Sequence, residues 1–158
     1  MIRPATVEDV ETIVGLVQDL ATYERASDRV QLDADLLRSA LFDERPAVFA
    51  HVAEEDGEVV GMAIWFLNFS TWTGRHGIYL EDLFVRPERR GQGHGRALLV
   101  TLARLAVQAG YGRVEWSVLD WNEPSIGFYR GLGAEAMDEW TTFRLSGDAL
   151  AGLAGEPD

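Results

Sequence analysis

Hydrophobic positions recur along the chain with two different periods, one typical of helices and one typical of strands. Helical spacing of apolar residues predicts helices over residues 10–21 and 36–41, and a stripe of leucine and alanine predicts a longer helix over 98–109. A short fourth helix is expected over 122–131, opened by an asparagine cap. Runs rich in β-branched and aromatic residues predict strands over residues 2–5, 47–53, 59–68, 77–86, 113–119 and 139–145.

These elements follow the order β-α-α-β-β-β-α-β-α-β, which predicts an α/β protein with a mixed sheet and helices on both faces. Thr6, followed three residues later by Asp9, is typical of a helix start. Gly57 lies in a Glu-Glu-Asp-Gly-Glu segment that predicts a tight hairpin, because glycine adopts a positive φ without steric cost. No repeat or low-complexity stretch interrupts the pattern, so we expect one domain over residues 1–158.

The charge balance narrows the classes of partner. With 26 acidic and 14 basic residues the formal charge is −12, which repels phosphate backbones and attracts cationic molecules, although many of the acids serve solubility equally well. We therefore expect no nucleic-acid partner, and no apolar run is long enough to predict a membrane span. The chain has no cysteine, which excludes a disulfide scaffold, a cysteine-ligated zinc and a cysteine nucleophile. Its first residues lack the basic-then-apolar order of a secretory signal, so a cytoplasmic protein is expected.

Three alternating glycines, Gly91, Gly93 and Gly95, lie between a predicted strand and a predicted helix. Glycines at such a point let the backbone approach an anion, whose charge then meets free amide donors at the helix N-terminus. Arg89 and Arg90 add positive charge beside them. An ordinary strand-to-helix turn would also use glycine, but the repeated glycines and the two arginines favour a phosphate cradle.

Two other phosphate-binding loops fit this segment less well. A dinucleotide fingerprint would place an acid about twenty residues beyond the loop, where Glu115 stands, but its third glycine is missing because Arg96 and Leu98 occupy the two possible positions. The loop also lies in the middle of the chain rather than after the first strand. A Walker A loop would need Gly-Lys-Ser/Thr, which does not follow.

The segment Arg90-Gly91-Gln92-Gly93-His94-Gly95 resembles the Arg/Gln-x-x-Gly-x-Gly/Ala loop of the GNAT superfamily of N-acetyltransferases, which also follows a strand and precedes a helix. The order of elements agrees with that superfamily over nearly the whole chain. The resemblance implies the GNAT acyl-CoA N-acyltransferase fold, with a mostly antiparallel sheet whose strands splay, and acetyl-CoA as the acetyl donor.

The same resemblance assigns cofactor contacts on both sides of the loop. It implies that backbone amides from Gly91 to Arg96 hold the CoA pyrophosphate. Main-chain groups that would pair with pantetheine, as an added strand does, belong to Leu83, Phe84 and Val85. His94 is interpreted as an exposed residue of the loop rather than as a base.

A second candidate half-site is the segment Trp121-Asn122-Glu123-Pro124-Ser125-Ile126-Gly127-Phe128-Tyr129. Asn122, Ser125 and Tyr129 share one helical face, because offsets of three, four and seven bring side chains together. Taken singly they have structural alternatives as a helix cap or as packing residues. The segment resembles the GNAT block Asn-x-x-(Ser/Ala)-x-x-Phe-Tyr, which implies that Tyr129 is the catalytic acid. It also implies cofactor contacts for Asn122, Pro124, Ser125 and Phe128.

The segment Tyr79-Leu80-Glu81-Asp82-Leu83-Phe84-Val85 resembles more specifically the spermidine/spermine (diamine) N-acetyltransferase branch of that superfamily. Further segments that share this resemblance are Ile2-Arg3-Pro4-Ala5-Thr6, Tyr23-Glu24 and Trp121-Asn122-Glu123-Pro124-Ser125. The branch implies a homodimer and a base in Glu81, which accepts the ammonium proton, often through water. Candidate substrate contacts are Tyr23, Glu24, Asp82 and Trp116. Adjacent strand residues face opposite ways, so Glu81 and Asp82 share a face only if a bulge intervenes.

The acceptor itself stays open between several small cationic amines. On the last predicted strand some polyamine enzymes place an acidic contact, whereas this chain has Trp140-Thr141-Thr142-Phe143. Polyamines, other diamines, thialysine-like lysine analogues and amino acids all remain candidates. Two alternatives of other classes are a protein acetyltransferase and a non-catalytic acyl-CoA-binding module, which would need neither Glu81 nor Tyr129.

The predicted chemistry starts from a protonated amine. An alkylamine with a pKa of roughly 10.4 must lose its proton before it can attack a thioester at neutral pH. Glu81 is the expected base, a strand amide near Leu83 the expected oxyanion donor, and Tyr129 the expected acid. Without cysteine, direct transfer in a ternary complex is favoured over a cysteine-bound acetyl intermediate, and no metal is required.

Overall fold

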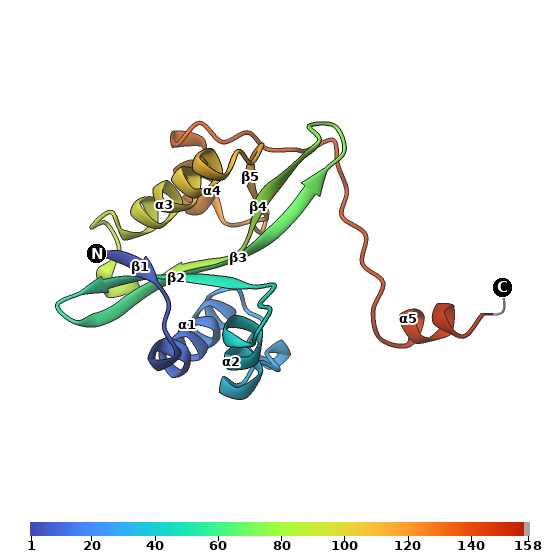
Figure 1. Cartoon of the computed structure of the whole chain (residues 1–158), viewed down its shortest axis with the longest axis horizontal. Coiled ribbons are helices and arrows are strands. Elements are labelled where there is room, and N and C mark those ends of the chain that lie inside the picture. Colours follow the sequence, from blue (N-terminus) through green and yellow to red (C-terminus); the bar gives the residue numbers. More distant parts are fainter. Residues whose placement is uncertain (157–158) are drawn as a thin grey trace. The chain divides into compact units, whose positions relative to one another are not determined.

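The computed structural model describes residues 1–156; residues 157 and 158, the end of the predicted domain, lie outside the described part. The chain divides into two compact units, residues 1–119 and 120–158, which we describe separately. The first unit contains β1 (Ile2–Pro4), α1 (Val10–Tyr23), α2 (Ala34–Phe42), β2 (Phe49–Glu55), β3 (Glu58–Ser70), β4 (Arg75–Val85), α3 (His94–Ala109) and β5 (Val114–Trp116) (Figure 1). Single 3-10 turns add η1 (Val7–Asp9), η2 (Ser27–Arg29) and η3 (Pro87–Arg89).

The strands of the first unit form a mixed sheet in the order β1-β2-β3-β4-β5. The first three pairings are antiparallel, whereas β4 and β5 run parallel, because α3 crosses over between them. β2 and β3 are joined by the two-residue turn Asp56-Gly57, whose φ angles of 52° and 81° are both positive, as a type I′ hairpin requires. The predicted hairpin and the predicted mixed sheet are therefore confirmed.

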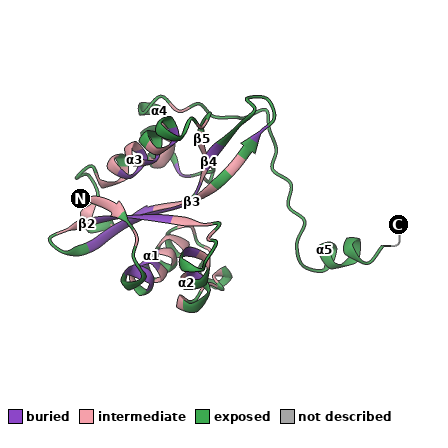
Figure 2. Cartoon of the chain, in the orientation of Figure 1, coloured by how far each residue is buried: buried purple, intermediate pink, exposed green. Residues whose placement is uncertain are grey.

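Helices cover both faces of this sheet. Figure 1 places α1 and α2 on one face and α3 on the other. Each helix buries one apolar stripe against the strands, and the buried positions concentrate in the sheet and on these stripes (Figure 2). The fully or nearly fully buried residues of the stripes are Val10, Ile13 and Leu16 on α1, Leu37 and Leu41 on α2, and Leu98, Leu102 and Ala106 on α3. The helical spacing in the sequence therefore predicts the correct faces.

The start of the first helical segment is held by a buried carboxylate. The Thr6 backbone amide donates a hydrogen bond to Asp9 at 2.7 Å, which confirms the helix start predicted from these two residues. Arg3 donates to both oxygens of the same carboxylate, at 2.7 and 3.0 Å. The guanidinium holds the pKa of Asp9 below its ordinary value, against the effect of burial. This contact ties β1 to the beginning of α1.

The second unit contains α4 (Glu123–Gly131), which confirms the predicted short helix, and α5 (Gly147–Ala154), which the sequence pattern does not predict. The strand predicted over residues 139–145 is wrong: within the described residues this segment forms no regular structure and pairs with no strand. Trp140 and Phe143 are 70% and 93% exposed. A β-rich run becomes a strand only where a neighbouring strand offers backbone partners, which no local pattern supplies.

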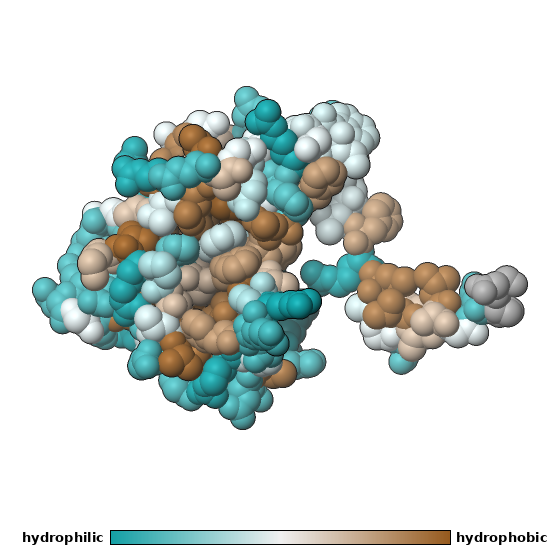
Figure 3. Space-filling view, in the orientation of Figure 1, coloured by the Kyte–Doolittle hydropathy of each residue, from teal (hydrophilic) through white to brown (hydrophobic). Residues whose placement is uncertain are grey.

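Two leucines of α5, Leu150 and Leu153, are about half exposed. Figure 3 shows apolar surface over this helix, and Figure 2 marks it as exposed along its length. Among residues 1–156 no helix has the length and hydropathy that crossing a membrane would need.

Candidate active site

A β-bulge in β4 brings two neighbouring carboxylates to one site. In the β3–β4 ladder Ile64 pairs with Asp82 and Trp65 pairs with Leu80, so Glu81 is an extra residue without a partner on β3. Such a bulge breaks the strict alternation of side chains along a strand. The sequence allowed Glu81 and Asp82 to share a face only through a bulge, and the structure places one at this position.

Two carboxylates act on a third, Asp82, around the bulge. Asp82 is partly buried, and its pKa is raised to about 6, first by burial and then by the negative charges of Glu81 and Glu24. Glu24 reaches the site from the C-terminal end of α1, and burial also raises its pKa. The fold therefore concentrates negative charge where the end of α1 meets β4, an arrangement that favours a cationic ligand.

The end of α1 has an unusual backbone. Arg25 adopts a φ of 59°, a left-handed conformation that favours glycine. The amide of Ala26 donates to the carbonyl of Ala21 at 2.8 Å and that of Arg25 donates to Thr22 at 3.1 Å, which is the hydrogen-bond pattern of a Schellman cap. This cap ends the helix directly after Tyr23 and fixes the backbone of Glu24.

β4 presents a free edge beside the carboxylates. β5 pairs only with Ile78–Leu80 and ends at Trp116, which lies opposite Leu80, the residue before the bulge. Within the described residues no strand pairs with 81–85 on that side. The main chain of Leu83, Phe84 and Val85 is therefore an edge to which an extended ligand could add, as the sequence analysis expects.

The glycine loop follows β4 and ends in the first turn of α3. Gly91 and Gly93 have φ angles of 77° and 87°, so both positions use the conformational freedom of glycine. A Cβ atom placed on either residue would meet no protein atom within 4 Å, which leaves open space over the loop. The first backbone amides of α3, from His94 onward, have no intrahelical acceptor. This geometry fits the pyrophosphate of coenzyme A.

His94 differs from the expectation of an exposed loop residue. It is the first residue of α3, its side chain is 13% exposed, and its Nε2 lies 3.5 Å from the Glu55 carboxylate, which also receives Arg89 at 3.1 Å. The helix N-terminus turns the imidazole toward β2, away from a loop position in solvent. The expectation of an exposed side chain is therefore corrected, and the contact that anchors the loop to the sheet is the ion pair between Arg89 and Glu55.

Arg90 directs its side chain out of the loop. Its guanidinium carbon lies 5.2 Å from the ring centroid of Tyr23 and 5.3 Å from that of Phe84, and its Nε donates to the Val85 carbonyl at 2.9 Å. The sequence analysis assigns Arg90 to the phosphate loop alone. Its contact with Tyr23, the neighbour of Glu24, has no local signal, because it joins residues far apart along the chain.

In the second unit, Asn122 is a buried N-cap of α4. Its side chain accepts a hydrogen bond from the Ser125 amide at 3.4 Å, and Pro124 lies in the first turn of the helix. Tyr129 is partly buried, and its ring centroid lies 5.5 Å from that of Phe128. The capping role of Asn122, one of its structural alternatives, is confirmed. The catalytic role of Tyr129 stays a prediction.

Glu115, which the sequence analysis weighs as a ribose-binding acid, and the histidine His51 both have structural partners. Glu115 accepts a hydrogen bond from Asn68 at 3.2 Å and pairs with Arg113 at 3.0 Å. His51, which has no predicted role, accepts a hydrogen bond from the Trp65 indole at 3.1 Å on Nδ1, and burial lowers its pKa. Within residues 1–156 no group of His, Cys, Asp and Glu side chains could hold a metal ion.

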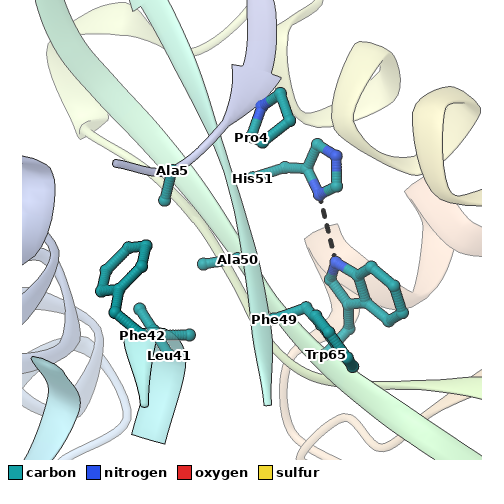
Figure 4. A pocket seen from close by; sticks show the side chains of 8 residues that line it. All are labelled: Pro4, Ala5, Leu41, Phe42, Phe49, Ala50, His51 and Trp65. Carbon is teal, nitrogen blue, oxygen red and sulfur yellow. Dashed lines mark hydrogen bonds between the residues drawn. The ribbon is translucent and has the colours of Figure 1, made fainter. Parts of the chain in front are cut away.

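An apolar pocket of about 200 Å³ lies beside His51, apart from the carboxylates. Figure 4 shows its walls, which come from β1, α2, β2 and β3. The lining residues are Pro4, Ala5, Leu41, Phe42, Phe49, Ala50, His51 and Trp65. None of them is a predicted site residue, so this pocket is separate from the candidate active site.

Known proteins resemble this chain in sequence and in fold. Residues 13–134 match the model of the Acetyltransferase (GNAT) family. The chain is 40% identical to the thialysine N-epsilon-acetyltransferase of Bos taurus, with 99% of this chain and 98% of that protein covered. It is 31% identical to the spermidine/spermine N(1)-acetyltransferase-like protein 1 of Homo sapiens, over 98% of this chain and 24% of that protein.

A solved structure supports the same conclusion at the level of the fold. The integron cassette protein from the mobile metagenome of V. cholerae superposes with a TM-score of 0.83 at 27% identity, covering 99% of this chain and 98% of that one. The mixed sheet, the glycine loop before α3 and the free β4 edge agree with this relationship. The chain therefore belongs to the Acetyltransferase (GNAT) family and is an N-acetyltransferase that acts on amine acceptors.

Proposed function

We propose that this enzyme transfers the acetyl group of acetyl-CoA directly to a primary amine of a small cationic acceptor, such as a thialysine-like amino acid, a diamine or a polyamine. The observation that carries the proposal is the group of three carboxylates around the β4 bulge, directly before the free edge of the same strand. Relatives whose names specify thialysine and spermidine/spermine as acceptors support this acceptor class.

The loop and the β4 edge would hold two parts of coenzyme A, the pyrophosphate and the pantetheine arm. Amides from Gly91 to Arg96 would hold the pyrophosphate at the N-terminus of α3. The main chain of Leu83, Phe84 and Val85 would pair with pantetheine along the edge. Bound in this way, acetyl-CoA supplies an activated thioester. Further contacts, proposed from the family resemblance, are Asn122, Pro124, Ser125 and Phe128.

Glu81 is the proposed base. The acceptor arrives as an ammonium ion, since its pKa is roughly 10.4 in water. The charges of Glu24 and Asp82 bind the ammonium, with Tyr23 and Trp116 as proposed contacts for the alkyl chain. Glu81, exposed at the bulge, accepts the proton directly or through one water. A bound cation also lowers the pKa of Asp82, so binding favours its charged form.

Two further groups of the chain complete the transfer. A backbone amide near Leu83 stabilises the oxyanion that develops when the acceptor nitrogen attacks. Tyr129 donates its hydroxyl proton to the departing sulfur, and the second proton of the attacking nitrogen restores the tyrosine hydroxyl. The ammonium therefore loses two protons, of which one is taken by Glu81 and released to water and one ends on the thiol of coenzyme A. The sequence holds no cysteine, so we propose direct transfer in a ternary complex without an acetylated cysteine.

Two properties of the whole protein belong to the same proposal. We place it in the cytoplasm, because the chain holds no cysteine that could form the disulfides typical of proteins in an oxidising compartment. We also expect a homodimer, on the resemblance to the diamine branch. Light scattering at micromolar concentration measures the mass directly, and a monomer would contradict that part of the proposal.

The deciding experiment is acetyl-CoA turnover against a panel of thialysine, ornithine, lysine, spermidine, a neutral amine and a lysine-containing peptide. We expect the small cationic amines to be the best acceptors and their kcat/KM to fall with added salt, which screens the acidic site. Exclusive activity on the peptide or on the neutral amine would contradict the acceptor class. Binding of acetyl-CoA without turnover on any amine would indicate a binding module.

The loop assignment has its own test in the melting temperature. Acetyl-CoA is expected to raise the Tm of the wild-type chain, because a ligand that binds only the folded state stabilises it. Gly93→Val fills the open space over the loop with a branched side chain, so the shift should vanish. Gly57→Val supplies a matched control outside the loop, because Gly57 also has a positive φ, 81°, and open space at its Cβ position. A Tm shift in Gly93→Val as large as that of the wild type would reject the pyrophosphate site.

A further inference from the structure

Arg90 belongs to the cofactor loop by sequence, yet its side chain is held by groups outside that loop. Its guanidinium lies over the rings of Tyr23 and Phe84, at 5.2 and 5.3 Å from their centroids. Its Nε donates to the carbonyl of Val85, the last residue of β4, at 2.9 Å. A planar guanidinium suits this combination, because it can stack on rings and donate a hydrogen bond at the same time.

The ring of Tyr23 belongs to the residue directly before Glu24, one of the three carboxylates. Tyr23 is the last residue of α1, and Glu24, which follows it, acts on Asp82 through its charge. The backbone just beyond them is strained, since Arg25 holds a φ of 59° in the left-handed region. The end of α1 is therefore a place where a side-chain contact can decide the position of an acceptor-binding residue.

We propose that Arg90 is a positioning residue that couples the cofactor loop to the acceptor carboxylates. A ligand that orders residues 91–95 also fixes the backbone of Arg90, whose guanidinium then holds Tyr23 and with it Glu24. The acceptor thus binds more tightly once coenzyme A is in place, and by linkage the acceptor tightens coenzyme A by the same factor. This inference rests on the proposed function, since it needs the loop to bind coenzyme A.

The neighbouring arginine provides a matched control. Arg89 carries the same charge one residue earlier, but its guanidinium pairs with Glu55 of β2 at 3.1 Å. Arg89→Met and Arg90→Met therefore remove equal charge from the same loop. Only the second removes the contact with α1. Arg90→Lys keeps the charge and loses the planar group, which separates attraction of the cofactor from stacking on Tyr23.

Hydrogen exchange of the backbone amides in residues 18–29 tests the coupling without any acceptor, with coenzyme A as the added ligand. Coenzyme A is added to each variant at a large excess over the Kd that titration calorimetry gives for that variant, so that all variants are compared fully bound. We expect slower exchange on binding in the wild type and in Arg89→Met, and no slowing in Arg90→Met or Arg90→Lys. Equal slowing in Arg90→Met, or none in the wild type despite a Tm shift, would overturn the proposal.

Acceptor kinetics give an independent readout through the split between KM and kcat. With saturating acetyl-CoA, Arg90→Met should raise the acceptor KM by about fivefold or more, the lower range of a coupling between sites, with a smaller change in kcat. In a Tyr23→Leu background the same substitution should change KM less than about twofold, because the contact is already gone. If Arg90→Met raised the acceptor KM by the same factor in both backgrounds, the proposed coupling would be overturned. Failure of the proposed function is distinct, because then the wild type would show neither turnover nor a Tm shift.

Discussion

The two halves of β4 share one strand but have different neighbours. Residues Ile78–Leu80 pair with β3 on one side and β5 on the other, and their first and last side chains are 0% and 2% exposed. Residues Asp82–Val85 pair with β3 after the exposed bulge at Glu81, and within the described part of the chain residues 81–85 have no partner on the other side. A free edge is thus made by ending a neighbouring strand early. The paired half supplies the rigidity that holds this edge in place.

The largest expected effect comes from Glu81, at the bulge that begins the part of β4 with a free edge. Glu81→Gln removes the proposed base and should lower kcat/KM near pH 7 by about 10²–10⁴, the typical range for a general base. Part of the activity should return at alkaline pH, where more of the amine arrives deprotonated. Because the side chain is exposed, the Tm should change little. A loss that is equal at every pH would contradict the assignment, and pH-rate profiles measure it.

The next largest effect tests Tyr129 as the proposed proton donor to the departing thiolate. Tyr129→Phe keeps the ring and removes the hydroxyl, so turnover should fall by about 10² while acetyl-CoA binding stays nearly intact. Tyr79→Phe is the matched control, because its hydroxyl contacts Ser117 at 2.9 Å in the paired half of β4. That variant should lose about 1 kcal/mol of stability or less and keep its rate. Wild-type turnover in Tyr129→Phe, with chemistry rate-limiting, would assign the acid role to another group.

The third effect breaks the paired half. A Cβ on Gly77 would lie 2.6 Å from Asn68 Oδ1 and 2.9 Å from the Arg113 carbonyl, so neighbouring strands would have to move. Gly77→Ala should therefore cost about 1–3 kcal/mol of unfolding free energy. Gly15→Ala, on an exposed helical position with no atom within 4 Å, should instead gain up to about 1 kcal/mol. Urea titration measures both, and a stable Gly77→Ala would show that this pairing is not tight.

The smallest expected effect tests the three carboxylates around the β4 bulge, which belong to Glu24, Glu81 and Asp82. The pKa of Asp82 is raised to about 6, so kcat/KM for the cationic acceptor should rise with pH through this value as the site gains charge. Glu24→Gln removes one of the charges that raise this pKa, so the acid limb should move to lower pH. Glu44→Gln removes an acid that has no such action on Asp82 and should leave the limb in place. If the acid limb stayed at the same pH in Glu24→Gln, Glu24 would not belong to the carboxylates that act on Asp82.

Local patterns predict most of the first unit. The apolar stripes of α1 and α3 and the Asp56-Gly57 turn depend on neighbours within a few residues, so sequence alone locates them. The strand predicted over 139–145 fails for the opposite reason, because its aromatic and threonine residues need a partner strand from elsewhere. α5 is also missed, although Ser146 before a run of alanine and leucine is a usable N-cap signal.

The site divides in the same way. The glycine loop is recognisable from its spacing, and the bulge at Glu81 was stated only as a condition, since nothing local specifies which residue of a ladder is extra. The approach of Glu24 to Asp82 and the contact between Arg90 and Tyr23 join segments that are distant along the chain. Such contacts follow from the packing of α1 on β4, which a single sequence does not specify.

The two tight turns that join β2, β3 and β4 have a consequence for folding. Asp56-Gly57 closes one hairpin, and four residues between Ser70 and Arg75 close the next, so this meander forms by closing very short loops. β1 must wait for the closure of a loop that contains two helices, and β5 for the crossover through α3. We therefore expect the folding nucleus in the meander, where local contacts form fastest. The strand that carries Glu81 would then take its register before either layer of helices has docked on the sheet.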